Sequence, residues 1–292
     1  MKCVFVVLHY CLYDVTKDCI TSLLSLRGDK EIVVVDNASP DDSGKELQKL
    51  YTNTDNVHII LNSSNLGFAA GNNIGYNYAK THLSPDVIIV LNNDTIIQDD
   101  NFLDKLFKLY CINEYHIVGP DILTYKGYHQ NPFRMKGLEL YQIKKKYLRA
   151  RIKKIVYSIP YLYKLVSTNN KGVTEEKEWC KHSAENVVLH GSAIIFTSKW
   201  IKNEEFAFYP GTFMYFEEDL LYSYARSKGY LTFYEPSLQI LHLEDMSTNA
   251  SLKGERKKTL FQTIHKINSL KVLLDFNILT SKNHEEKDNN QC

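Results

Sequence analysis

The first third of the chain alternates short apolar runs with segments whose apolar residues recur at helical spacing. The runs are mostly β-branched and aliphatic, as strands buried on both faces are. They are Cys3–Leu8, Glu31–Asp36, Val57–Leu61 and Val87–Leu91. Helical spacing appears in Thr16–Leu26 and Gly71–Thr81, and Ser39-Pro40 predicts another helix start. This order predicts an α/β fold with a mostly parallel central sheet flanked by helices.

The middle of the chain, about residues 125–181, predicts a basic, helical insertion. Its segment Lys144–Lys154 holds seven basic residues in eleven. Apolar residues fall on one face of the same predicted helix, at Leu148, Ile152, Ile155 and Ile159. A basic amphipathic helix over residues 144–159 could lie on an anionic membrane surface, or it could pack its apolar face on its own domain. The sequence leaves both interpretations open.

A β-type pattern returns from Glu185, with an apolar strand at Ala193–Thr197 and two short strands on either side of Pro236. A helix is expected from Leu220 to Lys228. Arg256–Phe276 predicts a long amphipathic C-terminal helix, and the polar residues after it are expected to fray.

Length and composition fit one large domain with a small appendage, since the chain has 292 residues, 44% of them hydrophobic. We place the main domain at residues 1–250 and the helix with its tail at residues 251–292. The net charge of +1 gives no reason to expect nucleic acid as a partner. No run approaches the roughly 18 apolar residues of a membrane span. The six cysteines form no C-x-x-C pair, which favours a reduced, cytoplasmic protein without a zinc site.

Acidic residues stand where two of the predicted strands end. Asp36 closes the second strand, and Asp94 follows the fourth. Ligands of open α/β sheets bind at the carboxyl ends of the strands. The turn after the first strand, His9–Asp14, contains no glycine, so the glycine-rich phosphate site of a dinucleotide fold is absent. A metal held by carboxylates is therefore the expected means of binding phosphate.

Several residues could contact a ligand at this edge of the sheet. Asp36 could accept hydrogen bonds from a nucleobase or ribose, or it could cap the next helix. The loop Asn65–Asn73, with two glycines, could bring the backbone close to an anion, or it could be a plain strand-to-helix turn. Asp94 could bind Mg²⁺ or Mn²⁺, or it could be a turn residue. His242 could complete such a metal site or be structural.

The densest acidic cluster of the chain is Glu217-Glu218-Asp219, between an aromatic segment and a predicted helix. Adjacent carboxylates raise one another's pKa values, which suits a general base. The alternative is a set of acids that complement the dipole of a helix N-terminus. Asp219 is the first candidate for a base and Glu218 the second.

The order of these blocks resembles that of the family 2 glycosyltransferases, in particular their rhamnosyltransferase-like branch. Four blocks carry most of the resemblance: Val33–Ser43 (VVVDNASPDDS), Asn65–Asn73 (NLGFAAGNN), Val90–Thr95 (VLNNDT) and Phe213–Tyr230 (FMYFEEDLLYSYARSKGY). His190–Phe196 (HGSAIIF) and the LHLEDMST segment that ends at Thr248 support it. The blocks extend over most of the chain in the family's order, and their combination is specific.

The resemblance implies a GT-A fold for the main domain and a nucleotide-sugar donor. It implies that Asp36 contacts the nucleoside. It also implies donor contacts from the residues in and beside the matching blocks. The expected nucleotide-sugar-binding residues are Asp36, Asn37, Asn65, Gly67, Gly71, Asn72, Asn73, Asn93 and Gly191.

The resemblance further implies a divalent metal, Mg²⁺ or Mn²⁺, as the cofactor. Asp94 matches the last acid of the family's D-x-D motif, and His242 matches a histidine that ligates metal in some members. Asp219, with Glu218, matches the catalytic position. Asn92 stands at the first D-x-D position, and the acidic cluster lacks the x-D-L spacing of many relatives. The base among residues 217–219 therefore stays open by one position.

The implied function is that of an inverting glycosyltransferase, which moves a sugar from a UDP- or dTDP-linked donor to a hydroxyl of an acceptor glycan. Bacterial surface polysaccharide assembly is the expected setting, with a lipid-linked acceptor and peripheral contact at the inner face of the membrane through residues 144–159. A nucleotidyltransferase would need a glycine-rich basic loop at His9–Asp14, which is absent. A catalytically degenerate domain that serves as a binding or scaffold subunit remains an alternative, because Asn92 replaces an acid.

Overall fold

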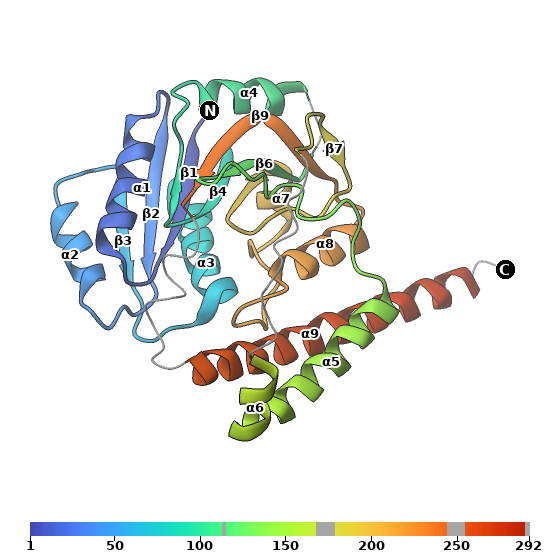
Figure 1. Ribbon diagram of the computed structural model, residues 1–292. Helices are drawn as coiled ribbons and strands as arrows, with labels where there is room; N and C mark the ends of the chain where they lie inside the picture. Colours follow the sequence, from blue (N-terminus) through green and yellow to red (C-terminus); the bar gives the residue numbers. More distant parts are fainter. Residues whose placement is uncertain (113–114, 168–178, 244–254, 290–292) are drawn as a thin grey trace.

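A curved sheet runs through the centre of the molecule, with helices on both of its faces (Figure 1). This computed structural model describes residues 1–112, 115–167, 179–243 and 255–289. The first half of the sheet has the order β3-β2-β1-β4, and its strands are all parallel. These strands are β1 (Cys3–His9), β2 (Lys30–Asp36), β3 (Val57–Leu61) and β4 (Val87–Asn92). The parallel arrangement predicted from the apolar runs is confirmed here.

The second half of the sheet is mixed. Its strands are β5 (Thr95–Ile96), β6 (Ile117–Thr124), β7 (Ala184–Glu185), β8 (Ala193–Thr197) and β9 (Thr232–His242). β8 lies antiparallel between β4 and β6, and β9 is parallel to β6 and antiparallel to β5 and β7. The two short strands expected around Pro236 form one strand, β9. Its pairing with β6 is irregular between Glu235 and Gln239, which leaves Pro236 outside the regular ladder.

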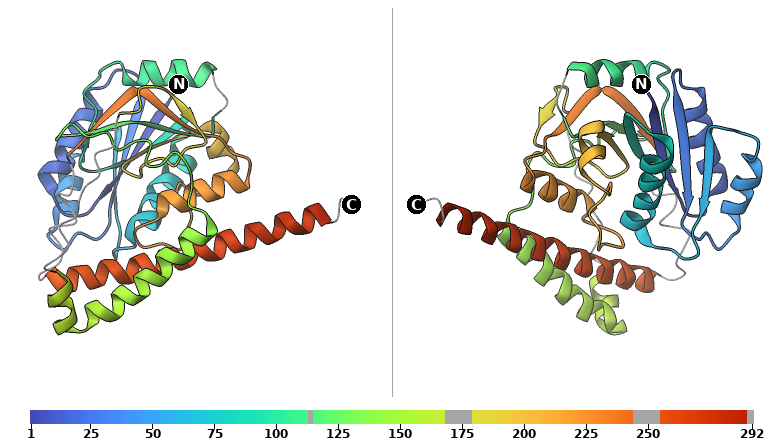
Figure 2. Two further views of the ribbon diagram at one scale, coloured as in Figure 1. Left: turned by 45° about the vertical axis from the view of Figure 1, so that its right-hand side comes forward. Right: turned by 180° about the vertical axis from the view of Figure 1, so that it is seen from behind.

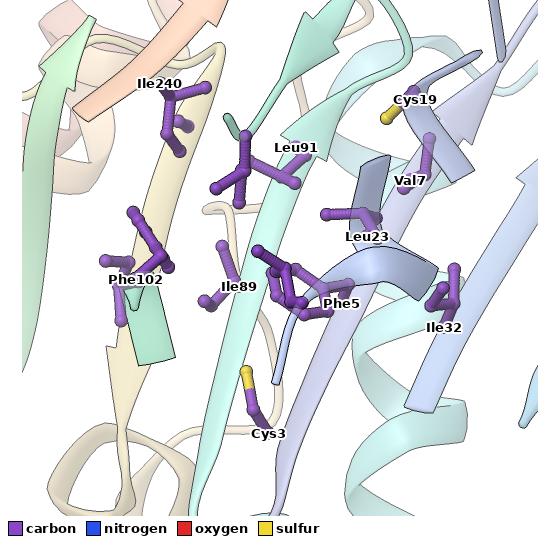
Figure 3. Packing of buried hydrophobic residues seen from close by; sticks show 14 of the residues in the cluster. Cys3, Phe5, Val7, Cys19, Leu23, Ile32, Ile89, Leu91, Phe102 and Ile240 are labelled. Atoms are coloured by element: carbon purple, nitrogen blue, oxygen red, sulfur yellow. The ribbon is translucent and has the colours of Figure 1, made fainter. Parts of the chain in front are cut away.

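Two apolar layers cover the two faces of the sheet, because successive strand residues point to opposite sides. Phe5 and Ile89 face one layer, shown in Figure 3, while Val6 and Val90 face the other. The first layer is closed by α1 (Tyr13–Ser25), α2 (Ser43–Leu50) and α4 (Phe102–Ile112). The second is closed by α3 (Gly67–Tyr78) with its π-helical extension η1 (Ala79–Leu83), α7 (Ser198–Asn203) and α8 (Glu217–Ser227). This packing fixes the strand ends that carry the candidate site.

Three further helices form a separate layer beneath α8, as Figures 1 and 2 show. They are α5 (Leu140–Ser158), α6 (Pro160–Ser167) and the long α9 (Glu255–Asn289). α5 begins with a capping box, in which Glu139 and Gln142 bond each other's backbone amides. A small apolar cluster of Ile143, Leu220 and Leu273 joins α5, α8 and α9. The C-terminal helix is therefore packed against the helix that carries the acidic cluster.

The apolar face predicted for α5 does not pack on the described part of the protein. Leu148, Ile152 and Ile155 are 59%, 53% and 64% exposed, and Ile159 just after the helix is 44% exposed. The buried side of α5 is a different one, which faces α9 through Ile143. Among the described residues, no helix is long and apolar enough to cross a bilayer. Of the two sequence-based interpretations, packing of this face on its own domain is wrong for the described residues.

Candidate active site

A cavity of about 480 Å³ lies at the carboxyl ends of β1, β2 and β4. Asn37, Asn92 and Asn93 line it where β2 and β4 end, and Tyr10 lines it after β1. The start of α3 adds the segment around Gly67. The remaining wall comes from distant parts of the chain, namely Phe213, Met214, Tyr215, Lys258, Phe261 and Gln262. We refer to this space as the nucleotide cavity.

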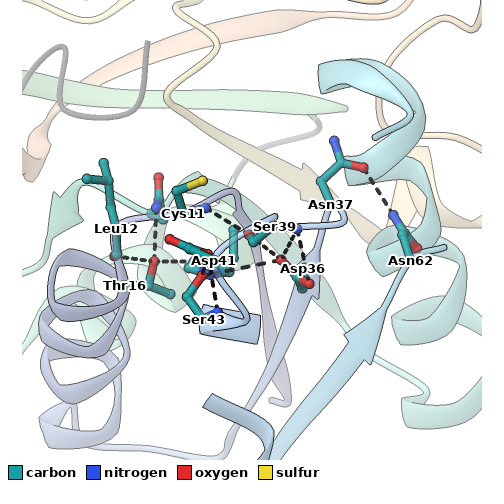
Figure 4. A network of polar contacts seen from close by, with 11 residues as sticks. Cys11, Leu12, Thr16, Asp36, Asn37, Ser39, Asp41, Ser43 and Asn62 are labelled. Atoms are coloured by element: carbon teal, nitrogen blue, oxygen red, sulfur yellow. Dashed lines mark hydrogen bonds and ion pairs between the residues drawn. The ribbon is translucent and has the colours of Figure 1, made fainter. Parts of the chain in front are cut away.

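The side chain of Asn37 holds the loop that leads into α3. Its Oδ1 atom accepts hydrogen bonds from the Leu66 amide at 3.0 Å and from Asn62 Nδ2 at 3.2 Å, the latter drawn in Figure 4. Its Nδ2 atom donates to Asn65 Oδ1 and to the Gly67 carbonyl, both at 3.1 Å. Asn37 and Asn65 therefore set the shape of one side of the nucleotide cavity.

Gly67 permits a close approach between this loop and the segment before α8. Its φ of +82° lies in the region that favours glycine, and a Cβ atom there would lie 2.3 Å from the Phe213 carbonyl oxygen. The next amide, of Phe68, donates to that same oxygen at 2.6 Å. One turn further on, a Cβ atom at Gly71 would lie 2.6 Å from Leu8 Cδ1. These two glycines bring the parts of the site together by backbone contact and close packing.

Asp36 lies beside the nucleotide cavity but is not among the residues that line it. Its carboxylate accepts hydrogen bonds from the Ser39 amide at 3.1 Å and the Ser39 hydroxyl at 2.5 Å (Figure 4). The predicted helix start at Ser39 is wrong, because α2 begins at Ser43. Asp41 Oδ1 accepts from the Ser43 amide and hydroxyl there. Asp36 thus fixes the turn that presents Asn37.

The expected donor-binding residues separate into two groups. Asn37, Asn65, Gly67 and Asn93 line the nucleotide cavity, and the others do not. The members outside its wall are Asp36, Gly71, Asn72, Asn73 and Gly191. Asn73 Oδ1 accepts from the amides of Ala207 and Phe208 at 3.0 and 2.9 Å, and its expected donor contact stays a prediction. Its amide is engaged with the backbone because α3 packs against that segment.

Strand pairing brings Asp94 and His242 into contact. Thr95 of β5 pairs with His242 of β9, and His242 Nε2 lies 3.2 Å from Asp94 Oδ1. His242 Nδ1 lies 2.7 Å from the Gln130 side-chain oxygen, which is an acceptor. In the neutral ring the proton therefore sits on Nδ1, and Nε2 presents a lone pair to Asp94.

This Asp94–His242 pair has the donor set of a cation site. Asp94 Oδ1 is buried and has no hydrogen-bond partner, and it faces a second electron-pair donor. Carboxylate and imidazole are ligands that Mg²⁺ and Mn²⁺ accept. Within the described ranges, no group of three or more His, Cys, Asp and Glu side chains could hold a metal. The acids expected after Leu243, up to Thr248, lie outside the described residues.

The three acids at the start of α8 point to different surroundings. Glu218 Oε1 accepts from the Gly191 amide at 3.3 Å. The next residue, Ser192, accepts at its carbonyl from the Asn92 amide at 2.9 Å, so Glu218 lies near the end of β4. Asp219 is buried and ion-paired with the Arg134 guanidinium. Glu218 is therefore directed towards the edge of the sheet where the nucleotide cavity lies, whereas Asp219 is directed towards Arg134.

Burial changes the proton affinity of all three acids. It raises the pKa of Asp219 to about 7, although the positive charge of Arg134 opposes the rise. It raises the pKa of Glu217 to about 8, with a further contribution from the charge of Glu218. The pKa of Glu218 is also raised by burial, against hydrogen bonds from its own backbone and from Gly191. The carboxyl groups at the start of α8 therefore take up protons at a higher pH than ordinary carboxyl groups do.

Several residues of the site were missed by the sequence-based prediction. Lys258, Phe261 and Gln262 line the nucleotide cavity from α9, which we had placed outside the main domain. Their spacing gives one face of a helix, and that pattern is the only signal the sequence holds. Arg134 and Gln130 belong to the insertion and have no recognisable motif around them.

The mixed sheet, the cavity at its parallel strand ends and the acids of α8 define an α/β protein of the GT-A class. Residues 3–166 match the family Glycosyl transferase family 2, which is more than half of the chain. The protein belongs to this family. The prediction of a family 2 glycosyltransferase is thus confirmed, and the rhamnosyltransferase-like branch stays a prediction.

Known proteins similar to this chain agree with the family. The low-salt glycan biosynthesis hexosyltransferase Agl10 of Haloferax volcanii is 32% identical over 102 residues, which are 35% of this chain and 31% of Agl10. The match thus spans about a third of that relative. Staphylococcus aureus TarS has a similar structure, with a TM-score of 0.54, 14% identity, and coverage of 91% of this chain and 70% of TarS. TarS in complex with UDP-GlcNAc matches with a TM-score of 0.53 and 14% identity, over 94% of this chain and 72% of TarS. This likeness confirms the GT-A-like fold.

Proposed function

We propose that this glycosyltransferase inverts the anomeric centre as it moves a sugar from UDP or dTDP to a hydroxyl of an acceptor glycan. The observation that carries the proposal is the meeting of three features at one edge of the sheet. These are the nucleotide cavity, the Asp94–His242 pair and the Glu218 carboxylate. A hexosyltransferase relative and a structural neighbour that binds UDP-GlcNAc support a hexose donor linked to a nucleotide.

The donor nucleoside would occupy the nucleotide cavity. Tyr10 offers an aromatic face on which a base can stack. Asn93 and the Asn65 loop add polar groups at the ends of β4 and β3. The N-terminal end of α3 favours negative charge, which suits the diphosphate. The tight packing of Gly67 against Phe213 keeps this wall in place before the donor arrives.

Asp94 and His242 would hold the divalent metal, Mg²⁺ or Mn²⁺. Such an ion, when bound, neutralises charge on the leaving diphosphate. Gln130 fixes the ring of His242 so that Nε2 faces Asp94, which is the positioning role of an outer partner. Asn92 at the first D-x-D position leaves this site with one carboxylate among the described residues.

Glu218 would act as the general base. It takes the proton from the acceptor hydroxyl as that oxygen attacks the anomeric carbon, and the bond from this carbon to the diphosphate breaks with its electrons on the leaving oxygen. General-base assistance contributes about 10²–10⁴-fold to the rate. We favour Glu218 over Asp219, which sequence reasoning ranked first, because Asp219 is engaged by Arg134.

The exposed face of α5 supports an acceptor at a membrane surface. Leu148, Ile152 and Ile155 stand among the basic residues of the same helix, and Tyr161 and Leu165 of α6 are 72% and 55% exposed. Interfacial helices combine such a face with lysine and arginine. We propose that the protein meets a lipid-linked acceptor at the inner face of the membrane, during surface polysaccharide assembly.

A donor-hydrolysis screen tests this function. The protein is incubated with UDP- and dTDP-linked sugars, with and without Mn²⁺, and release of the nucleotide is followed. We expect release from at least one donor to depend on Mn²⁺. Glu218→Gln should lower the rate of transfer by about 10²–10⁴-fold while the nucleotide still binds. Binding of UDP or dTDP with no turnover of any donor would instead favour a catalytically degenerate binding subunit.

A further inference from the structure

A second cavity, of about 680 Å³, lies between α5 and α9. Its walls come from one face of each helix and from Phe216, which directly precedes the acids of α8. Gln262 lines both this cavity and the nucleotide cavity. The two spaces are therefore neighbours that share part of α9 as a wall. Nothing in the proposed donor binding uses the second one.

Four basic side chains line this second space, which we refer to as the basic cavity. They are Lys146, Arg149 and Lys153 of α5 and Lys266 of α9, and no carboxylate from the described part of the chain belongs to the lining. The pKa of Lys266 is lowered, first by desolvation and then by the positive charge of Lys153. Positive charges that face one another across a cavity repel, and an anion between them removes that repulsion. The chemistry of the basic cavity thus suits a phosphate group.

The basic cavity also lies beside the start of α8, the helix that carries the proposed base. The charge of Lys146 acts on the Asp219 carboxyl and lowers its pKa, against the larger effect of burial. Phe216 connects the lining directly to Glu217 and Glu218 along the chain. An anion bound here would hold an attached hydroxyl-bearing group near the start of α8. This position fits an acceptor substrate rather than a second donor.

An apolar surface continues outwards from the basic cavity. Ile152 lines the cavity and is also 53% exposed, so it joins the two regions. Ile155 and Ile159 extend the apolar face along the outside of α5 and just beyond its end. A ligand with a phosphate head and a long hydrocarbon chain would match both parts. The phosphate would meet the cations, and the chain would run over the apolar face to the bilayer.

We propose that the basic cavity binds the diphosphate of a lipid diphosphate that carries the acceptor glycan. The proposal rests on the glycosyl transfer proposed above and adds the substrate class of its acceptor. Arg149 and Lys153 of α5 bind the diphosphate on one side, and Lys266 of α9 binds it on the other. The lipid chain leaves along Ile152 and Ile155, and the glycan points towards Glu218.

Calorimetry with decyl diphosphate tests this assignment on the full chain. Arg149→Gln combined with Lys153→Gln should weaken its binding at least tenfold. The matched control, Lys144→Gln combined with Lys145→Gln, removes the same charge from α5 outside the cavity lining and should change it less than twofold. Lys266→Gln, on the other helix, should also weaken the binding of decyl diphosphate, by at least threefold. Equal effects of the two double variants would overturn the proposal, since they would indicate general attraction to a basic helix.

Further binding measurements distinguish a lipid diphosphate from free pyrophosphate and from phospholipid headgroups. Pyrophosphate should bind at least tenfold more weakly than decyl diphosphate, and equal affinity would overturn the lipid assignment. Vesicles of phosphatidylglycerol and phosphatidylcholine should bind the cavity variant and the Lys144/Lys145 control variant alike, because both lack the same charge on α5. A loss in the cavity variant that is confined to vesicle binding would favour a headgroup surface instead. Binding of UDP and of dTDP is measured on every variant. If the wild-type chain bound neither nucleotide, the proposed transfer would be refuted, while the decyl diphosphate result would still decide whether the basic cavity binds a lipid diphosphate.

Discussion

His242 Nε2 lies 3.2 Å from Asp94 Oδ1, across the short ladder that pairs β5 with β9. The two residues are far apart in the sequence and meet because the Leu243 amide donates to the Asp94 carbonyl and Thr95 pairs with His242. Both side chains are nearly buried. A site defined by the backbone in this way is formed before any ligand binds.

His242→Ala should therefore remove the metal dependence of nucleotide binding. The change deletes one of two facing ligands and leaves Asp94 alone, and we expect UDP affinity in Mn²⁺ to fall at least tenfold towards its value without metal. Titration calorimetry with and without Mn²⁺ measures this. His82→Ala, an exposed histidine on η1, is the matched control and should bind as the wild type does. Unchanged metal dependence in His242→Ala would exclude this residue as a ligand.

Glu218, the proposed general base, should be required for turnover and not for nucleotide binding. Glu218→Gln is expected to lower kcat by about 10²–10⁴-fold with nucleotide affinity unchanged, because only proton transfer is lost. The wild-type kcat should fall as the pH is lowered, because protonated Glu218 cannot act as a base. The midpoint of this fall should lie above the usual carboxyl range, since burial raises the pKa of Glu218. The pH profile of kcat is the measurement. A Glu218→Gln enzyme that keeps more than a tenth of the rate would place the base elsewhere.

Glu217 should make folding stability fall as pH rises. Burial raises its pKa to about 8 in the folded protein, from an ordinary value of 4.5. Between these values the unfolded chain loses the proton and the folded chain keeps it, so each pH unit costs about 1.4 kcal/mol. The free energy of unfolding of Glu217→Gln, measured relative to wild type by urea unfolding, should rise on the order of 2–4 kcal/mol between pH 5 and pH 8. Glu46→Gln, on the surface, should follow the wild type at both pH values.

Arg134→Met should destabilise the protein by leaving the Asp219 carboxylate buried and without its partner. Loss of one partner costs about 3–5 kcal/mol in a fully buried pair, and we expect about 2 kcal/mol here because the Arg134 side chain is 30% exposed. The double variant Arg134→Met/Asp219→Leu should recover part of this loss in urea unfolding. If the double variant is no more stable than the single one, the ion pair is not the cause.

Ile155→Ser should weaken binding to anionic vesicles without a change in stability, because Ile155 is 64% exposed in the free protein. Burial of part of such a side chain in a membrane contributes about 1 kcal/mol, so a loss of threefold to tenfold is expected in vesicle sedimentation. Leu279→Ser on α9, at a residue 62% exposed, is a matched control outside this face. Equal losses in the two variants would argue against a specific membrane face.

The sequence was most informative where strands are buried on both faces. The runs that contain Phe5 and Ile89 are unmistakable because every position must be apolar, and the parallel half of the sheet follows from them. The β8 strand is apolar in the same way, yet its antiparallel direction depends on the path of the insertion. No local pattern records that path. The start of α2 was misplaced because Ser39 bonds to Asp36, which outweighs its capping preference.

The candidate site was predictable where its residues end a strand. Asp94, Asn93 and Asn37 follow buried runs, and the edge of the sheet brings them together. Arg134 and Gln130 could not be found, because their roles arise only when the insertion folds over α8 and β9. The apolar stripe on α5 was recognisable in the sequence, which left open whether it packs on its own domain or lies on a membrane surface. Periodicity shows which residues share a face and says nothing of the neighbour.

The contribution of α9 to the nucleotide cavity bears on how family members can be recombined. The segment that matches the family profile ends at residue 166, whereas Lys258, Phe261 and Gln262 complete the cavity from the far end of the chain. A chimera that takes only the segment matching the family from another member would combine the strand ends of one parent with the α9 helix of the other parent. Donor preference in such hybrids should follow the fit between the two pieces, so both must be transplanted as a unit.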